Sequence, residues 1–217
     1  RDAFFDGARR YFHAHAYGNT TLDDLLAELS STSGRDLTEW ARAWLQTSGV
    51  STLTLEHTGN GHHDIVQTDP RPHRIAVACY DHNPARDLVR TYRVEIDAVD
   101  THTRIELPDA PLILLNDDDL TYAKIRLDER SLATVESSLD RVRDPLARGL
   151  IWSALWNATR DGELAATRYI AMATRFSTNE SNLSLLTAVL ANAPAAIEHY
   201  LPAGARPQTR AAWLDAV

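Results

Sequence analysis

The sequence predicts a multidomain α+β protein, with a small antiparallel β-sandwich between two helical blocks. Apolar residues recur with a helical period of about 3.6 in residues 1–49 and 128–217, and with a strand period of two in residues 50–127. Short runs rich in Gly, Pro, Asn and Asp separate the strand-like segments, as turns do in a sandwich. These observations define three expected domains: 1–49, 50–127 and 128–217.

Three helices are expected in the first block. An aromatic-rich apolar stripe runs from the start of the sequence to Gly18, where the helix should stop. A Thr followed three residues later by an Asp, within residues 20–24, predicts a capping box for a second helix, which Gly34 should close. The third helix is expected to start at Asp36 and to be closed by Gly49.

The second block predicts strands separated by turns. Apolar residues alternate with polar ones in three runs: Leu53 and Leu55, then Ile75, Val77 and Cys79, then Leu88, Tyr92, Val94 and Ile96. Turn signals stand between the runs, at residues 59–61, 69–72, 81–84 and 108–111. The last two strands are expected at 112–115 and 122–127.

The third block predicts a series of helices with short connections. Asp144 before Pro145 has the form of an N-cap followed by Pro at the first helical position, and this helix should stop at Asp161. Further helices are expected at 163–176 and 183–193. Helices of this length with short polar connections pack as antiparallel pairs, so we expect the start of an α-helical solenoid of the HEAT or armadillo kind.

The five tryptophans lie in the helical blocks, at Trp40, Trp44, Trp152, Trp156 and Trp213. Two pairs are spaced four residues apart, on one helix face, which favours a role in core packing. The predicted sandwich has no tryptophan, and so lacks the aromatic platform expected of a sugar-binding module.

Composition excludes several classes of partner. The formal net charge is −8 and lysine occurs only at Lys124, so neither nucleic acid nor an anionic membrane surface is an expected partner.

The single cysteine, Cys79, cannot form an intrachain disulfide. No apolar run approaches the ~20 residues that span a bilayer and no signal peptide is visible, so we expect a cytoplasmic protein. The frequent use of Arg and Ala suggests a GC-rich, actinobacterial genome.

The nine histidines suggest a test for metal binding. His13 and His15 are two residues apart on a predicted helix, so they face in different directions. Four potential ligands are close in sequence around a Gly-rich turn: His57, His62, His63 and Asp64. A polar hairpin is the simpler interpretation of this loop, since zinc needs three or four convergent ligands. The helical motif His-Glu-x-x-His, which places two zinc ligands and a base on one face, is absent.

Two further candidates point to ordinary structure. The acidic run Asn116-Asp117-Asp118-Asp119 lacks the ligand spacing and the closing Glu of a calcium loop, and favours a turn between strands. Cys79 alternates with apolar residues, which favours a buried side chain over a nucleophile. Neither a Gly-x-Ser-x-Gly elbow nor a phosphate-binding Gly loop occurs in the sequence.

Two long stretches carry a resemblance to a known family. The first is RDAFFDGARRYFHAHAYGNTTLDDLLAELSSTSGRDLTEWARAWLQTSGV, which resembles the end of the catalytic domain in zinc aminopeptidases of the aminopeptidase N type, a group of gluzincins. The positions that fit the family pattern are Phe5, Gly7, Tyr11, Phe12, Tyr17, Gly18, Asn19, Thr20, Asp24, Leu25, Trp40, Trp44, Leu45 and Gly49. The second stretch, from Leu112 to Leu164, is similar to the junction of sandwich and helical domain in actinobacterial members.

The resemblance implies a fold and an activity for the protein that contains this chain. Residues 1–49 would be the helical end of a thermolysin-like catalytic domain, 50–127 the sandwich, and 128–217 the first helices of a truncated C-terminal helical domain. The family uses zinc to activate a water that attacks the N-terminal peptide bond of a peptide. Its His-Glu-x-x-His and Gly-x-Met-Glu-Asn motifs have no counterpart here. We therefore expect no catalytic, cofactor-binding or metal-ligating residue, no bound zinc and no peptidase activity in this chain alone.

The ends of the sequence also suggest a piece of a larger protein, because it starts at Arg1 inside one helical pattern and stops at Val217 inside another. The expected partners are then the peptide substrates of the whole enzyme, its upstream catalytic domain and the helices that follow. Two alternatives remain open. One is a sandwich-plus-solenoid module that binds proteins without enzyme activity, and the other is a metal-dependent protein that uses the 57–64 loop.

Overall fold

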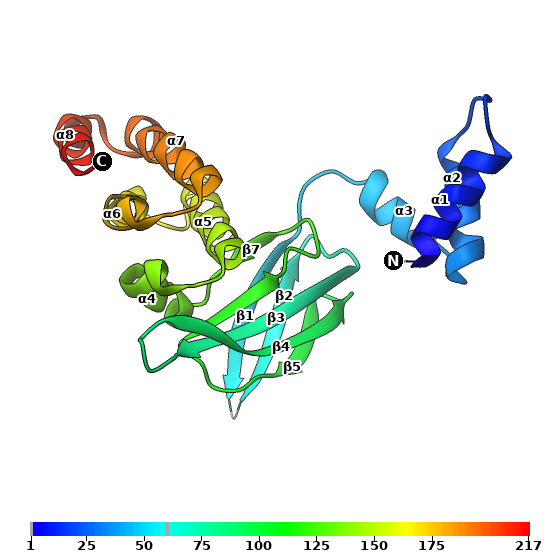
Figure 1. Ribbon diagram of the computed structural model, residues 1–217, viewed down its shortest axis with the longest axis horizontal. Helices are drawn as coiled ribbons and strands as arrows, with labels where there is room; N and C mark the ends of the chain where they lie inside the picture. The colour runs from blue at the N-terminus through cyan, green and yellow to red at the C-terminus, as the bar shows by residue number, and fades with distance from the viewer. Residues whose placement is uncertain (1, 60) are drawn as a thin grey trace. The chain divides into compact units, whose positions relative to one another are not determined.

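The computed structural model describes residues 2–59 and 61–217 (Figure 1). The chain divides into two compact units, one ending at Gly49 and the other starting at Val50. The first unit is entirely helical, whereas the second holds two sheets followed by helices. The chain is thus an α+β protein with N-terminal helices, two small sheets and C-terminal helices, in the order that the periodicity predicts.

The first unit consists of α1 (Asp2–Ala14), α2 (Leu22–Ser33) and α3 (Thr38–Leu45). The helices α1 and α2 approach each other at Gly7, where a Cβ would lie 2.7 Å from Thr32 Oγ1 and 2.9 Å from Leu29 Cδ2. The Thr32 hydroxyl also donates a hydrogen bond to the carbonyl of Ala3 at 2.8 Å. The absence of a side chain at Gly7 therefore permits the close contact between these two helices.

The caps predicted for the second helix are confirmed. The Thr21 side chain accepts a hydrogen bond from the backbone N–H of Asp24, and the Asp24 carboxylate accepts one from the backbone N–H of Thr21 at 2.8 Å. This reciprocal pair is a capping box. Gly34 closes the helix with a left-handed φ of 66°, which glycine adopts without strain.

Two predicted helix ends in this unit are wrong. The first helix stops at Ala14, four residues before Gly18. The residue with left-handed backbone after this helix is Tyr17, with a φ of 63°, and not Gly18. The third helix stops at Leu45, four residues before Gly49. Glycine marks a place where the chain is able to turn, but it does not require the helix to extend that far.

The strands of the second unit form two sheets (Figure 1). The first sheet has the order β5 (His102–Glu106), β2 (His62–Thr68), β1 (Thr52–Gly59) and β7 (Lys124–Arg126). The second sheet has the order β4 (Leu88–Ala98), β3 (His73–His82) and β6 (Leu112–Asp117). The runs expected for the last two strands correspond to β6 and β7.

The expectation of a purely antiparallel sandwich is wrong at one sheet edge. Strand β7 runs parallel to β1, with Lys124 opposite Thr52. The backbone N–H of Lys124 donates to the carbonyl of Ser51, so β7 enters the sheet beside the start of β1 and continues in the same direction. Alternation of apolar residues predicts a strand but carries no information about its direction.

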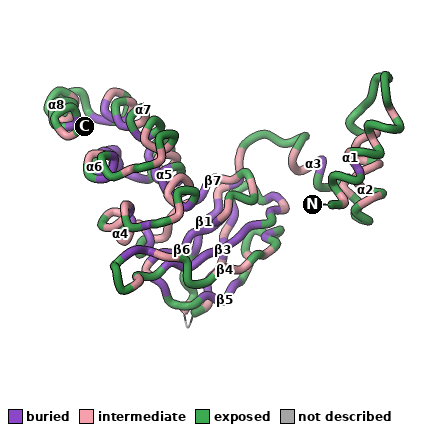
Figure 2. Tube along the Cα trace, viewed as in Figure 1, coloured by how far each residue is buried: buried purple, intermediate pink, exposed green. Residues whose placement is uncertain are grey.

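The inner faces of the two sheets share one hydrophobic core. Its residues include Leu53, Leu55 and Ile65 from the first sheet and Ile75, Val77, Cys79, Ile113 and Leu115 from the second. The opposite face of the second sheet packs into another core, to which it contributes Ala78, Tyr80, Leu88, Leu112 and Leu114. The central strand β3 is therefore buried on both faces (Figure 2), which accounts for its nearly continuous apolar sequence.

Helices provide the rest of this second core. They are α4 (Glu129–Ser138), α5 (Pro145–Arg160), α6 (Ala166–Phe176), α7 (Leu183–Tyr200) and α8 (Arg206–Ala216), with short 3-10 turns η1 (Leu139–Arg141), η2 (Ser177–Asn179) and η3 (Ala203–Ala205). The predicted N-cap of α5 is confirmed, because the Asp144 carboxylate accepts a hydrogen bond from the N–H of Leu146 at 2.9 Å. Within the described residues, no helix has the length and apolar character that a membrane crossing requires.

Two helix boundaries differ from the predicted ones. The helix α6 begins at Ala166, three residues later than expected. The helix α7 continues past residue 193, through Pro194, to Tyr200. Because Ala196 and Ile197 are buried in the core, packing keeps this segment helical despite the helix-breaking tendency of proline.

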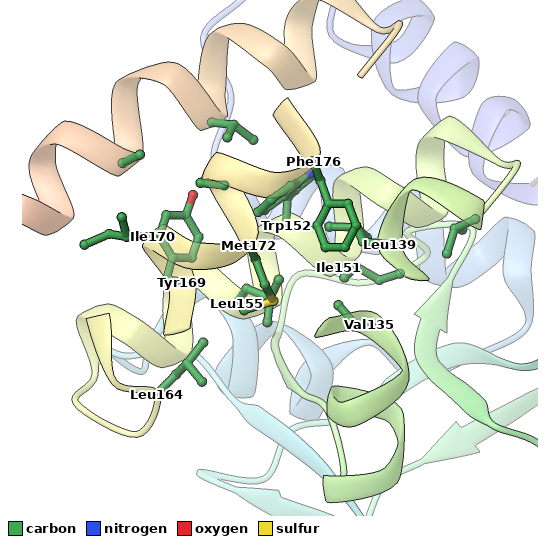
Figure 3. Packing of buried hydrophobic residues seen from close by; sticks show 14 of the residues in the cluster. Val135, Leu139, Ile151, Trp152, Leu155, Leu164, Tyr169, Ile170, Met172 and Phe176 are labelled. Atoms are coloured by element: carbon green, nitrogen blue, oxygen red, sulfur yellow. The ribbon is translucent and has the colours of Figure 1, made fainter. Parts of the chain in front are cut away.

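The tryptophans differ in how far they are buried. Trp152 and Trp213 are buried, and Trp152 lies among the core side chains of Figure 3. Trp156 is partly buried and its ring centroid lies 5.4 Å from that of Tyr169. Trp40, however, is 42% exposed, so the core role predicted for it is wrong. The short helix α3 buries only Ala41, which leaves the Trp40 ring without a core to enter.

Candidate functional site

The hairpin of β1 and β2 brings two histidines together. His57 and His63 are direct cross-strand partners. Nδ1 of His57 lies 3.2 Å from Nε2 of His63, and their ring centroids are 4.8 Å apart. Nδ1 of His63 lies 3.3 Å from the carbonyl oxygen of Gly61. His57 is exposed whereas His63 is buried, and burial lowers the pKa of His63 below its usual value.

This histidine pair lines a groove of about 890 Å³. Its apolar part includes Leu55, Leu107, Ile113 and Leu127, and its polar part includes Asp109, Asp128, Glu129 and Arg130. Arg130 donates to the carboxylate of Asp109, and this interaction lowers the pKa of Asp109. Asp128 is the N-cap of α4, because its carboxylate accepts from the backbone N–H of Ser131 at 3.0 Å. The groove therefore combines two imidazoles with two carboxylates, those of Asp109 and Asp128, that already have partners.

The other two residues of the predicted metal loop face elsewhere. His62 Nδ1 lies 3.4 Å from Glu106 Oε1, and the Asp64 carboxylate accepts from Arg104 at 3.1 Å. Side chains of neighbouring strand residues point to opposite faces of a sheet, so His63 is separated from both of its neighbours. In the part of the chain that the structure describes, no group of three or more His, Cys, Asp or Glu side chains is placed to hold one metal ion. The hypothesis that His57, His62, His63 and Asp64 together bind a metal ion is therefore wrong.

The acidic turn after β6 is held by arginines and a tyrosine. The Asp117 carboxylate accepts from the Tyr80 hydroxyl at 2.6 Å and from Arg90 at 2.5 Å. The Asp118 carboxylate accepts from Arg90 at 2.9 Å and from Arg93 at 2.6 Å. Burial and the neighbouring Asp117 raise the pKa of Tyr80. The segment joins β6 to β7, so the predicted turn between strands is confirmed. The arginines that neutralise it lie on β4, too far away in the sequence to be recognised as partners.

A second ionic cluster joins the sheets to the helices. Lys124 donates to Asp161 at 2.6 Å, and Arg126 donates to both Asp161 and Glu163. The two basic residues lie on β7 and the two acidic residues follow α5. Because the Arg126 side chain is only 10% exposed, its attraction to these carboxylates is less screened by solvent than that of a surface ion pair. The cluster therefore forms ion pairs between the edge strand of the first sheet and the residues that follow α5.

Cys79 has the properties of a structural residue. It is fully buried between the two sheets, and burial raises the pKa of its thiol to about 11. Its sulfur lies 3.8 Å from the carbonyl oxygen of Pro108. A protonated, inaccessible thiol is a poor nucleophile. The prediction of a buried side chain is confirmed.

The part of the second unit from β6 onward matches a known class of domain. Residues 112–217 match the family model described as ERAP1-like C-terminal domain. The sequence is also 39% identical to aminopeptidase N of Streptomyces lividans over 236 residues, which covers 99% of this chain and 28% of that relative. Aminopeptidase N of Lactococcus lactis subsp. lactis is 36% identical over 55 residues, covering 25% of this chain and 6% of the relative. The chain is a homologue of aminopeptidase N and corresponds to a little over a quarter of the Streptomyces relative.

The resemblance implies zinc, and the residues present do not fit a zinc centre of the family kind. Such a centre needs three protein ligands and an open position for water. The described residues bring two histidines together, at His57 and His63, but no third ligand to join them. No step of zinc-dependent hydrolysis can therefore be assigned to a described side chain of this chain.

Proposed function

We propose that the chain is a non-catalytic, supporting portion of a zinc-dependent aminopeptidase that removes N-terminal residues from peptides. The observation that carries this proposal is the alignment with the Streptomyces aminopeptidase N, which covers 99% of the chain. It includes both units and the segment around Gly49 between them. The family's zinc and substrate motifs are absent from the sequence, which favours a non-catalytic role for these residues.

The proposed division into domains follows the resemblance. Residues 1–49 are the last helices of a thermolysin-like catalytic domain, 50–127 are the sandwich, and 128–217 are the first helices of a HEAT- or armadillo-like domain. Several aromatic side chains of the first unit are exposed, namely Phe4, Phe5, Phe12, Tyr17 and Trp40. Exposed aromatic rings on a small helical unit need a partner surface, which supports packing against the upstream part of a catalytic domain.

Each part has a proposed task in the whole enzyme. The helices of residues 1–49 close the catalytic domain from behind, and the sandwich acts as a spacer. The helices from Glu129 onward begin the cap over the active-site chamber. Their last described members, α7 and α8, expose Leu183, Leu190 and Leu214, which supports further helices packing there. The catalytic zinc and the peptide substrate would then be held outside the described residues, by a cytoplasmic enzyme without nucleic-acid or membrane partners.

The experiment that tests this proposal compares the chain with its natural gene product. The gene is sequenced upstream of the codon for Arg1, and the whole open frame and the 217-residue chain are expressed separately and assayed on aminoacyl amides. We expect Gly-x-Met-Glu-Asn and His-Glu-x-x-His upstream, zinc-dependent hydrolysis by the whole product, and none by the chain. An upstream frame without these motifs would favour a protein-interaction module, and hydrolysis by the chain after two independent purifications would contradict a supporting role.

A further inference from the structure

The histidine pair of the β1–β2 hairpin has the geometry of a two-point metal site. Two nitrogens bound to one tetrahedral zinc at ~2.0–2.1 Å lie about 3.3 Å apart. Nδ1 of His57 and Nε2 of His63 are 3.2 Å apart. In the structure this distance is that of a hydrogen bond, so one proton stands between the two rings. A metal ion could replace that proton after a small rotation of the exposed ring of His57.

The hydrogen bond to Gly61 assigns the tautomer of His63. A carbonyl oxygen only accepts hydrogen bonds, so the ring nitrogen Nδ1 that lies 3.3 Å from it carries the hydrogen. In the neutral ring Nε2 then presents its lone pair to His57. Histidines that bind metals usually donate their other N–H to a carboxylate or a backbone carbonyl, which orients the ring in this way. His63 is therefore already oriented as a ligand.

The surroundings give an ion access to both rings. Both histidines line the groove of about 890 Å³, so an ion with bound water reaches them from solvent. Asp109 and Asp128 line the same groove and add negative charge, part of which Arg130 offsets.

We propose that His57 and His63 form a two-imidazole site for a divalent transition-metal ion, with water or an added ligand in the remaining positions. The ion binds Nδ1 of His57 and Nε2 of His63. The proton on Nδ1 of His57 moves through solvent to Nε2 of the same ring, so both imidazoles stay neutral and no net proton is released. With two protein ligands, the site exchanges its ion more readily than a structural zinc site with four.

The test is a calorimetric titration of the 217-residue chain with Zn²⁺ in a buffer that does not bind metals. We expect one ion per chain, and a loss of affinity of about tenfold or more in His57→Ala. His62→Ala removes the adjacent imidazole, which lies beside Glu106, and is the matched control with unchanged affinity. His57→Phe, which keeps a ring without nitrogen, replaces the alanine variant if that variant does not fold.

Nuclear magnetic resonance of the imidazole nitrogens decides which atoms bind. On addition of Zn²⁺, the resonances of Nδ1 of His57 and Nε2 of His63 should shift, while those of His62 stay in place. Failure of the chain to bind Zn²⁺, equal binding by His57→Ala and the unaltered chain, or equal losses in both alanine variants would overturn the proposal. The pair would then be a hydrogen bond between two histidines only.

Discussion

Among single residues, Tyr80 has an unusual role, because a side chain of the hydrophobic core also holds a buried carboxylate. Its ring lies on the face of the second sheet that packs against the helices, and its hydroxyl donates to Oδ1 of Asp117 at 2.6 Å. Asp117 is 1% exposed and its other oxygen accepts from Arg90 at 2.5 Å. A buried charge is costly unless hydrogen bonds compensate it, so this pair of donors determines whether the turn after β6 is stable.

We predict that Tyr80→Phe lowers the free energy of unfolding by about 1–2 kcal/mol, because it leaves one oxygen of a buried carboxylate without its donor. Tyr122→Phe makes the same chemical change at a side chain that is 73% exposed, and should alter stability by less than about 0.5 kcal/mol. Urea denaturation followed by circular dichroism measures both. Equal stability of the two variants would show that the hydroxyl is not needed by Asp117.

The buried ring of His73 should make the stability of the fold depend on pH. Burial, and to a lesser extent the nearby charge of Arg71, lower its pKa to about 4, whereas an unfolded chain has a histidine pKa of about 6.5. Between these values the unfolded chain binds a proton that the folded chain does not. The neutral ring therefore makes its full contribution to the free energy of unfolding above pH ~6.5. This contribution is lost as the pH falls toward ~4, and the loss is on the order of 3 kcal/mol at most.

The variant His73→Gln tests this assignment. It removes the titrating ring, so its stability should fall less steeply between pH 6.5 and 4 than that of the unaltered chain. His82→Gln, at an exposed position of the same strand, is the control and should keep the original slope. The measurement is the midpoint of urea denaturation at several pH values. An unchanged slope in His73→Gln would assign the pH dependence to other groups, such as His63.

Among the secondary-structure elements, α5 has a start that is defined by a side-chain cap and a proline. Its N-cap, Asp144, accepts from the N–H of Leu146 at 2.9 Å, and Pro145 occupies the first turn. The helix places Ile151, Trp152 and Leu155 in the second core. Because the other helices and the second sheet pack around these side chains, the position at which α5 starts affects the packing of the whole unit.

We predict that Asp144→Ala lowers the stability of the second unit by about 1 kcal/mol, because it removes the acceptor for a helix N-terminal N–H. Asp144→Asn keeps an acceptor oxygen at the same position and should lose less than half as much. Thermal denaturation followed at 222 nm compares the three proteins. If the two variants lose equal stability, the contribution of Asp144 comes from its negative charge beside the helix dipole and not from the cap.

At the scale of the molecule, the second sheet couples the sandwich to the helices. Its inner face closes the core of the sandwich, and its outer face is part of the core made with α4 to α8. The ionic cluster of Lys124 and Arg126 with the residues after α5 adds a second connection. The boundary predicted at residue 127 therefore crosses a continuous hydrophobic interface, although the fold changes there from strands to helices.

We predict that residues 50–127 do not fold cooperatively alone, whereas residues 50–217 do. Removing the helices exposes an apolar face that contains Tyr80, Leu88, Leu112 and Leu114, and each of these large side chains contributes about 1.5–3 kcal/mol when buried. Scanning calorimetry of the two pieces checks this. A sharp, reversible transition of the 50–127 piece would mean that the sandwich is independent of the helices.

The sequence by itself determined the type and order of the elements and the family relationship. Periods of 3.6 and two depend on which side chains of one element face a core, and this information is local. The capping box of α2 and the N-cap of α5 are local as well, which is why both were predictable. Tertiary structure decided three other features: the direction of β7, the continuation of α7 through Pro194 and the pairing of His57 with His63. Each depends on contacts between distant segments or on the register of a sheet, and a single sequence does not contain these explicitly.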